Sequence, residues 1–314
     1  MNRFRSSGGE LAYVDEGEGP AVLLLHGFPL SSQLWRGLIP ILASRHRVIV
    51  PDLLGLGASD KPRESALDIR GQAAYMGELL DHLGIDRVAI IGHSTGGGIA
   101  QLLVAERPSV EALVLIDSIA FDLWPTEATT EVQVASPELE TFDSVELVIR
   151  SAFRLGMREG ELPEDDLQAY LEPWRDPMAV PALFRWARSI DGRGLRELEA
   201  QMPAWDLPTL ILWGEEDPFH PPAIGERLND AIASSALGLV PDCGHFLPVE
   251  APDTIYPIIS EYLRANYLRI PHGHAAEGPI LVPLGVSGAL RFDDDDGDDA
   301  EPVVRDDQEV GPNA

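Results

Sequence analysis

Short, uninterrupted runs of aliphatic residues recur along the chain, separated by longer stretches in which apolar and polar residues mix. The runs occupy residues 21–25, 47–50, 88–91, 112–116 and 209–213, with a weaker sixth at 237–240. A continuous apolar run of this length is typical of a β-strand that is buried on both faces, as strands of parallel sheets are. The pattern therefore predicts a sheet whose strands are mostly parallel.

Helical periodicity fills most of the intervals between these runs. The segments with this pattern are residues 72–83, 97–106, 224–232 and 255–268. Gly84 and Pro108 come just after the first two segments and are typical of helix ends. Strands that alternate with helices indicate an α/β fold with a doubly wound, mostly parallel sheet.

The alternation is interrupted between about residues 121 and 205, where the sequence favours helices. One predicted helix is capped by Asp143 or Ser144 and ends at Gly156. The apolar residues on one of its faces are Val145, Val148, Ile149, Ala152 and Phe153. A second predicted helix begins at Asp176-Pro177. Its inward-facing residues are Leu183, Phe184, Ala187 and Ile190. We interpret the segment as a helical cap inserted after the strand at 112–116.

These boundaries divide the chain into three predicted parts. Residues 1–120 and 206–269 form the α/β core, and residues 121–205 form the cap. Residues 270–314 are rich in Gly, Pro and Asp and include the run Asp293-Asp294-Asp295-Asp296. A segment with so much charge cannot supply a buried core, so we expect this acidic tail to be disordered.

The composition excludes several classes of partner. The chain has 314 residues, a formal net charge of −29 at pH 7 and a single cysteine. So strong a negative charge disfavours nucleic acids and anionic membranes as partners. No stretch reaches the roughly 20 apolar residues of a membrane span, and the first residues lack the apolar segment of a secretory signal. We expect a cytoplasmic protein with a small-molecule substrate, and the composition leaves its oligomeric state open.

One serine lies in a glycine-rich turn between a predicted strand and a predicted helix. Residues 92–96 read Gly-His-Ser-Thr-Gly, which is the G-x-S-x-G pattern of a nucleophile elbow in its expected strand–turn–helix context. A serine at so sharp a turn takes a strained backbone conformation, and flanking side chains would collide with neighbouring elements. Gly92 and Gly96 remove those side chains, so we expect Ser94 to be a nucleophile.

A serine hydroxyl needs a base to take its proton, and that base is most often a histidine oriented by a carboxylate. His245 follows the last predicted strand, and Asp217 follows the strand at 209–213. Both should lie at the same end of the parallel sheet as Ser94. We therefore predict a triad of Ser94, His245 and Asp217, with Asp117 as the alternative acid.

The remaining candidates carry weaker signals. His93 is adjacent to the serine but should point away from it, so we interpret it as a packing residue. His26 is expected to shape the loop that follows it, and His220 could approach the pocket. No pair of histidines has the H-E-x-x-H spacing, so we predict no metal and no cofactor. Cys243 is interpreted as a buried filler rather than as a thiol nucleophile.

The oxyanion of a tetrahedral intermediate needs hydrogen-bond donors. One candidate is the backbone N–H of Thr95, at the start of the predicted helix. The other is the N–H of Phe28, in the loop His26-Gly27-Phe28-Pro29 that follows the first apolar run.

Taken together, residues from about 8 to 268 resemble the α/β-hydrolase superfamily. The motifs that carry the resemblance are the elbow, the loop at 26–29, Asp52-Leu53-Leu54-Gly55-Leu56-Gly57-Ala58-Ser59-Asp60, Trp213-Gly214-Glu215-Glu216-Asp217 and Gly244-His245. The chain order of serine, aspartate and histidine is that of the superfamily. Ser94-Thr95-Gly96-Gly97-Gly98 is similar to the branch of cofactor-free haloperoxidases and esterases. Lactonases and carbon–carbon bond hydrolases share much of the same pattern.

Three departures narrow what the resemblance implies. Haloalkane dehalogenases and epoxide hydrolases of this fold carry Asp where Ser94 stands, which argues against their chemistry here. Proline iminopeptidases carry H-G-G-P in place of the H-G-F-P of residues 26–29. Many carbon–carbon hydrolases have Trp after the catalytic His, where this chain has Phe246.

The resemblance implies a serine hydrolase that cleaves a carboxylic ester or a lactone through an acyl-enzyme. The aromatic and aliphatic residues of the cap favour a small, largely apolar substrate. The predicted pocket residues are Trp124, Phe153, Phe184, Trp186 and Phe246. Carbon–carbon cleavage and haloperoxidase or perhydrolase activity by the same triad are alternatives, and so is a ligand-binding protein of the same fold without turnover. The sequence leaves the substrate and its stereochemistry open.

Overall fold

The computed structural model describes residues 1–123, 127–158, 161–192 and 194–267. The predicted acidic tail lies outside these residues, and so does Trp124. In this part of the chain no helix is long and apolar enough to cross a membrane.

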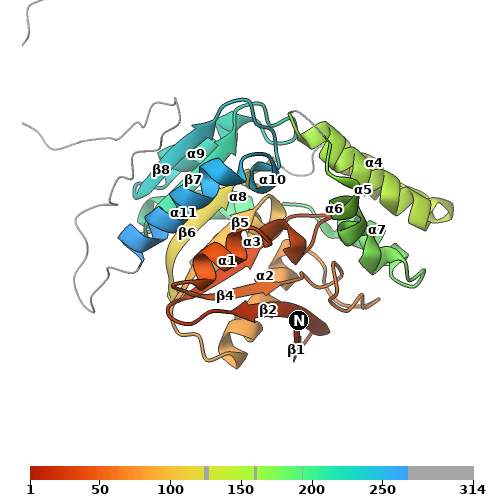
Figure 1. The fold of residues 1–314 in the computed structure, drawn as a ribbon, viewed down its shortest axis with the longest axis horizontal. Coiled ribbons are helices and arrows are strands. Elements are labelled where there is room, and N and C mark those ends of the chain that lie inside the picture. The colour runs from red at the N-terminus through yellow and green to blue at the C-terminus, as the bar shows by residue number, and fades with distance from the viewer. Residues whose placement is uncertain (124–126, 159–160, 193, 268–314) are drawn as a thin grey trace, which may run out of the picture.

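An eight-stranded sheet with the strand order β1-β2-β4-β3-β5-β6-β7-β8 forms the centre of the molecule (Figure 1). The strands are β1 (Asn2–Arg5), β2 (Glu10–Glu16), β3 (Ala21–Leu25), β4 (Arg47–Pro51), β5 (Val88–His93), β6 (Val110–Ile116), β7 (Thr209–Gly214) and β8 (Ser235–Val240). The pairings among β3 to β8 are all parallel, which confirms the predicted doubly wound α/β fold. Every residue of β3, β5 and β7 is buried, which explains why these strands read as continuous apolar runs.

The apolar pattern does not predict β1 and β2, which pair antiparallel at one end of the sheet. Most residues of β1 are exposed, so this strand needs no run of apolar residues by which the sequence could reveal it.

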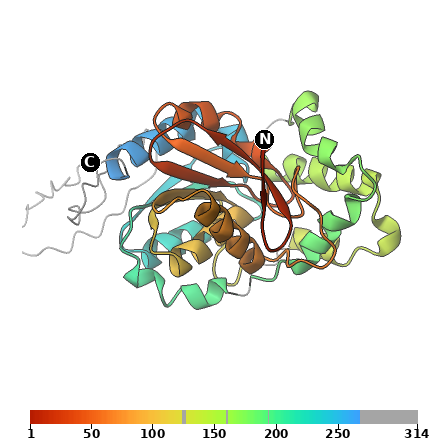
Figure 2. The ribbon, with the colours of Figure 1, turned by 90° about the horizontal axis from the view of Figure 1, so that it is seen from below.

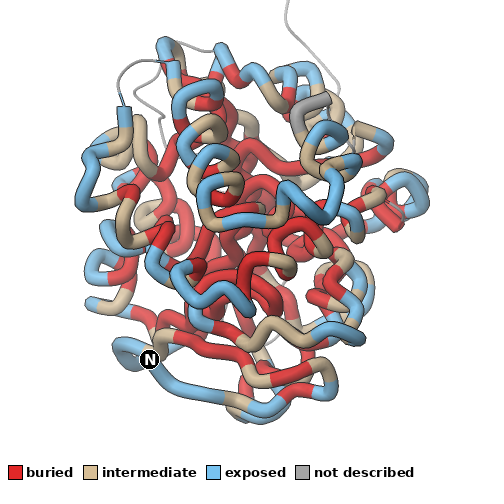
Figure 3. The backbone as a smooth tube through the Cα atoms, turned by 90° about the vertical axis from the view of Figure 1, so that its right-hand side faces the viewer, coloured by how far each residue is buried: buried red, intermediate tan, exposed pale blue. Residues whose placement is uncertain are grey.

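Helices cover both faces of the sheet. They are α1 (Leu38–Ala43), α2 (Ile69–His82), α3 (Thr95–Glu106), α9 (Pro222–Ala231), α10 (Leu247–Glu250) and α11 (Pro252–Asn266), with a 3-10 turn η1 (Ser32–Trp35). α1 packs against α11, and α2 packs against α3. Figure 2 shows α1 and α11 on one face of the sheet and α2 on the other. The buried residues, red in Figure 3, run through the centre of the molecule between these layers.

Further helices lie between β6 and β7 in the chain. Most of them lie at one end of the sheet (Figure 1), whereas the last one packs against α3. They are α4 (Glu127–Gln133), α5 (Phe142–Gly156), α6 (Glu164–Leu171), α7 (Val180–Ser189) and α8 (Leu195–Leu198), with 3-10 turns η2 (Pro137–Leu139), η3 (Glu172–Trp174) and η4 (Met202–Ala204). We call α4 to α7 the inserted helices.

The starts of two inserted helices differ from the prediction. α5 is capped by Thr141, whose hydroxyl accepts a hydrogen bond from the N–H of Ser144 at 3.2 Å, so neither Asp143 nor Ser144 is the cap. α7 begins at Val180 rather than at residue 176. The carboxylate of Asp176 accepts a hydrogen bond from the N–H of Met178 at 2.9 Å, which forms a turn before the helix.

Candidate active site

Ser94 lies in the turn between β5 and α3, in a backbone conformation that side chains rarely adopt. Its φ is 54° and its ψ is −120°. A Cβ atom at Gly92 or at Gly96 would lie 2.5 Å or less from a backbone oxygen. Glycine is therefore required on both sides of this strained turn, as predicted.

Asp217 and His245 form a buried, hydrogen-bonded pair at the same end of the sheet. Asp217 follows β7 and His245 follows β8, and the Nδ1 of His245 donates to the Oδ2 of Asp217 at 2.8 Å. The Oδ1 of Asp217 accepts hydrogen bonds from the N–H groups of Phe219 and His220, at 2.8 and 2.9 Å. Burial acts to raise the pKa of the Asp217 carboxyl. The charge of His245 and the hydrogen bond that it donates outweigh this effect, so the pKa lies below its ordinary value. The carboxylate is thus held ionised, with His245 as its partner.

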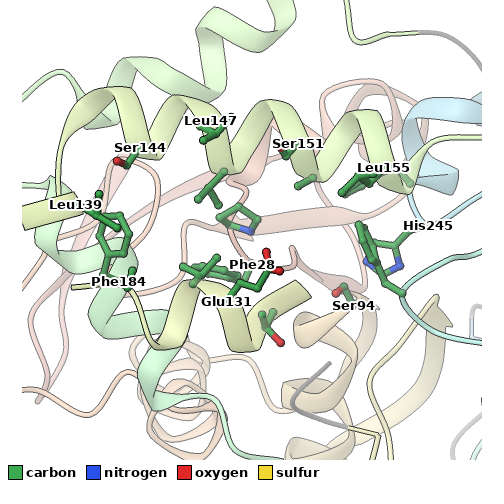
Figure 4. Close-up of a pocket in the computed structure, with 18 of the residues that line it drawn as sticks. Phe28, Ser94, Glu131, Leu139, Ser144, Leu147, Ser151, Leu155, Phe184 and His245 are labelled. Atoms are coloured by element: carbon green, nitrogen blue, oxygen red, sulfur yellow. The ribbon is translucent and has the colours of Figure 1, made fainter. Parts of the chain in front are cut away.

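Ser94 and His245 line the same end of one cavity (Figure 4). Because Nδ1 of His245 is the donor to Asp217, the Nε2 of a neutral His245 is free to accept a proton. The Ser94 hydroxyl makes no hydrogen bond to His245 or to any other described residue. Catalytic hydrogen bonds are often long in an empty site and tighten when substrate binds. The structure therefore brings the three predicted triad residues together, with the acid–base pair already joined.

His93 has a contact that the sequence does not predict. Its Nε2 donates to the backbone carbonyl oxygen of His245 at 2.8 Å, and the two rings are 4.9 Å apart. Burial holds the pKa of His93 well below its ordinary value, so the ring is neutral. His93 is therefore more than a packing residue, because it ties the loop that carries His245 to the end of β5.

A second layer of titratable side chains lies behind the acid–base pair. Asp117, the alternative acid, accepts a hydrogen bond from the N–H of Gly214 at 2.9 Å and is not bonded to His245. Burial, followed by the nearby charge of Asp217, raises the pKa of Asp117 well above its ordinary value. His220 donates from Nδ1 to the carbonyl oxygen of Asp117 at 2.7 Å, and burial lowers the pKa of His220 to about 4. The lowered pKa of His220 favours its neutral form, and the raised pKa of Asp117 disfavours a second carboxylate beside Asp217.

Asp217, His220 and His245 bring possible metal-ligand atoms within 4.8 Å of one another. The Nδ1 atoms of both histidines and the carboxylate of Asp217 take part in the hydrogen bonds described above. The absence of a metal from the mechanism stays a prediction. Burial raises the pKa of Cys243 to about 11, which disfavours the thiolate that a nucleophilic cysteine needs.

The backbone N–H groups of the two predicted oxyanion donors differ in what they bind. Thr95 is the first residue of α3, and its N–H finds no acceptor among the described residues. The N–H of Phe28 donates instead to the Oγ1 of Thr95 at 2.9 Å. His26 holds the loop before Phe28, since its Nε2 accepts a hydrogen bond from the N–H of Leu53 at 3.0 Å. His26 therefore shapes this loop, as predicted.

The cavity has a volume of about 500 Å³ and is mostly apolar. One end carries Ser94 and His245, and the other end carries Leu139 and Phe184 (Figure 4). α5 lies along its length. Glu131 of α4 is the one carboxylate that lines the cavity in the described part of the chain, and Figure 4 shows it reaching into the space between the two ends.

The predicted pocket residues divide into two groups, with Trp124 outside the described residues. Phe184 and Phe246 line the cavity. Phe153 does not line it, because its ring packs behind that of Phe246 at 4.6 Å. Trp186 does not line it either: its ring stacks on that of Phe28 at 5.3 Å, and its Nε1 donates to the carbonyl oxygen of Leu54 at 3.0 Å.

The sequence analysis does not predict the cavity residues of α5. They are Ser144, Leu147, Val148, Ser151, Ala152 and Leu155. Leu147 and Leu155 are large apolar side chains that are exposed, because they lie outside the buried face of this helix. Apolar residues at such positions are the signal that could have identified them.

Comparisons with known proteins agree with this architecture. The family model described as alpha/beta hydrolase fold matches residues 20–252. Haloalkane dehalogenase 2 of Mycobacterium tuberculosis is 33% identical over 270 residues, which cover 82% of this chain and 93% of the relative. A soluble epoxide hydrolase of a Corynebacterium species is 31% identical over 269 residues, covering 79% of this chain and 92% of the relative. The solved structure of a thermophilic esterase from Thermogutta terrifontis has 27% identity and a TM-score of 0.70, covering 84% of this chain and 97% of that one.

Proposed function

The chain belongs to the α/β-hydrolase family, and we propose that it is a serine hydrolase that cleaves a carboxylic ester or a lactone. The observation that carries the proposal is the serine at the strained turn between β5 and α3, beside the pair of His245 and Asp217.

The chemistry of a serine favours acyl transfer over the reactions named for two of the relatives. If a serine oxygen attacked a saturated carbon that bears a halide, or an epoxide carbon, the product would be an ether that water does not readily cleave. Attack on a carbonyl carbon gives an ester, which water can hydrolyse with the same histidine as base. The similarity to a dehalogenase and an epoxide hydrolase therefore supports a hydrolase of the same fold, and Ser94 supports a carbonyl substrate.

In the proposed reaction, the Oγ of Ser94 bonds to the carbonyl carbon while its proton passes to the Nε2 of His245. The π electron pair of the carbonyl moves to its oxygen, and the N–H of Thr95 donates to this oxyanion. Collapse of the intermediate breaks the bond to the alcohol oxygen, which takes the proton from His245. Water then repeats the sequence on the acyl-enzyme and releases a carboxylic acid. Asp217 stabilises the imidazolium in both halves.

The cavity supports a substrate with an extended apolar part. Its volume of about 500 Å³ lies within the range of ligand pockets, roughly 300–1,000 Å³. The reacting carbonyl would lie at the end that carries Ser94, and the apolar chain would run beneath α5 toward Phe184. A substrate that fills this length is larger than the small molecule expected from the composition of the inserted helices.

The test is a fluorophosphonate probe combined with matched substrate panels. We expect the probe to label Ser94, and the full chain to hydrolyse p-nitrophenyl esters of graded acyl length or lactones of graded ring size. Ser94→Ala should lose both properties. Release of halide from haloalkanes or of diols from epoxides at rates above ester hydrolysis would contradict the proposal. Labelling without turnover of any ester or lactone would instead support the ligand-binding alternative.

A further inference from the structure

We propose that the side-chain hydroxyl of Thr95 is a catalytic group, a second donor to the oxyanion beside the backbone N–H of the same residue. This inference rests on the proposed function, because it concerns the oxyanion that forms when Ser94 attacks a carbonyl.

The observation is the hydrogen bond between Phe28 and Thr95. The backbone N–H of Phe28 donates to the Oγ1 of Thr95 at 2.9 Å, so the hydroxyl oxygen is the acceptor in this contact. A hydroxyl that accepts such a bond still has its own hydrogen to donate. The side chain of Thr95 is buried, yet no acceptor for this hydrogen lies among the described residues. A buried donor without an acceptor is energetically costly and points to a ligand that accepts a hydrogen bond from it.

The position of the hydroxyl indicates which ligand atom completes it. Thr95 follows Ser94 directly and is the first residue of α3, a twelve-residue helix whose N-terminus favours negative charge. The loop that carries Phe28 touches the serine, since a Cβ atom at Gly27 would lie 2.7 Å from the Cβ of Ser94. The hydroxyl is thus placed beside the carbon that Ser94 attacks. The acceptor that forms there during the reaction is the former carbonyl oxygen.

The proposed arrangement uses Phe28 indirectly. As the bond from Ser94 to the carbonyl carbon forms, an electron pair moves to the carbonyl oxygen. The resulting oxyanion accepts hydrogen bonds from the N–H and the O–H of Thr95. Phe28 donates to the oxygen of that O–H and polarises it, which strengthens the outer hydrogen bond. No proton leaves Thr95, since the proton of Ser94 is the one that passes to His245.

The hydroxyl of Thr95 could instead hinder catalysis, and this role makes an equally specific prediction. If the Oγ1 of Thr95 only blocked the N–H of Phe28, removing it would open the oxyanion site and would raise kcat. The two roles therefore predict changes of opposite sign in the same variant.

The experiment compares Thr95→Ser and Thr95→Ala, a pair that differs only in the hydroxyl, with Thr95→Val as a third variant. We expect Thr95→Ser to keep kcat on the best ester within about threefold, because the donor is retained. Thr95→Val should lose roughly 10²- to 10³-fold in kcat, as other oxyanion donors do, with KM nearly unchanged. Thr95→Ala should fall between them, because the N–H of Phe28 can then reach the oxyanion directly. A boronic acid that mimics the tetrahedral intermediate should lose affinity in the same order.

A kcat for Thr95→Ala equal to or above that of the wild type would overturn the proposal, and so would equal losses in Thr95→Ser and Thr95→Ala. Thermal unfolding of all variants separates these outcomes from misfolding. Wild type and Ser94→Ala are measured alongside them. Full activity of Ser94→Ala would reject the proposed function itself. If Ser94→Ala lost activity while Thr95→Ala kept that of the wild type, only the role of Thr95 would be rejected.

Discussion

The Nε2 of His93 donates a hydrogen bond to the backbone carbonyl oxygen of His245, 2.8 Å away. The first residue ends β5 beside Ser94, and the second follows β8, so the bond joins two parts of the site that are 152 residues apart in the chain. It fixes the backbone of the residue that we propose as the base for Ser94.

Loss of this bond should slow catalysis without removing any member of the triad. We expect His93→Leu to lower kcat about 10- to 100-fold, because small displacements of a catalytic group are costly, with less change in KM. His93→Gln keeps a side-chain N–H donor and should recover part of the loss. Steady-state kinetics of both variants provide the check, and equal activity in wild type and His93→Leu would show that His93 only fills space.

The two buried aspartates should differ sharply in their contribution to the rate. Asp217→Asn should lower kcat by about 10⁴, because the amide cannot hold His245 in the tautomer that accepts a proton. Asp117→Asn should change kcat far less, since Asp117 bonds to Gly214 and not to His245. A larger loss in Asp117→Asn than in Asp217→Asn would reverse the assignment of the acid.

Acid should destabilise the folded protein partly through His220. Its pKa is about 4 in the fold against 6.5 for an ordinary histidine, so between these values the unfolded chain binds a proton that the folded chain does not. The stability contributed at neutral pH is therefore lost as the pH falls from 6.5 towards 4, at up to about 1.4 kcal/mol per pH unit for one such group.

Urea unfolding at several pH values between 7 and 4 tests this expectation. His220→Asn keeps a donor for the carbonyl oxygen of Asp117 but does not titrate, so the slope of stability against pH should become shallower. His82→Gln, at an exposed position, is the matched control and should keep the slope of the wild type. An unchanged slope in His220→Asn would show that His220 does not contribute.

Glu131 should make the site discriminate between substrates by charge. Its carboxylate reaches into a mostly apolar cavity and forms no ion pair with a described residue. Among esters of equal length, those with a terminal ammonium or a neutral group should be preferred over those with a terminal carboxylate. The preference should be modest, because an exposed charge contributes about 1 kcal/mol at most, or roughly fivefold in kcat/KM.

Glu131→Gln should reduce this preference, and added salt should reduce it in the wild type. Glu138→Gln is the control, since Glu138 is an exposed residue nearby that does not line the cavity. If Glu131→Gln and Glu138→Gln kept identical charge preferences, the contact between Glu131 and the substrate would be refuted.

The central fold could be predicted, and so could the positions of Ser94, Asp217 and His245 at one end of the sheet, because the signals for both are local. Strands β3 to β8 are buried on both faces or pack in a parallel sheet, and this burial leaves apolar runs in the sequence. The turn at Ser94 requires glycines at fixed spacings, and parallel strands place the residues that follow them at one end of the sheet. The exposed strand β1 carries no comparable signal.

The contacts of the site could not be predicted because they depend on packing between distant segments. Nothing near His93 in the sequence indicates that its ring reaches the backbone of His245. Trp186 and Phe184 lie on the same helix, but only Phe184 lines the cavity, since a difference of two positions turns a side chain to another face. Likewise, the acceptor for the N–H of Phe28 is a side chain 67 positions along the chain.

The stacking of Trp186 on Phe28 has a consequence for how such an enzyme can diverge. The ring that stacks on Phe28 belongs to α7, and its Nε1 donates a hydrogen bond to the carbonyl oxygen of Leu54. A lineage that exchanged its inserted helices to accept a new substrate would also replace the side chain that packs against Phe28 in the proposed oxyanion loop. Recognition and turnover in this molecule would therefore have to be adapted as a pair, with compensating changes at Phe28 accompanying any successful graft.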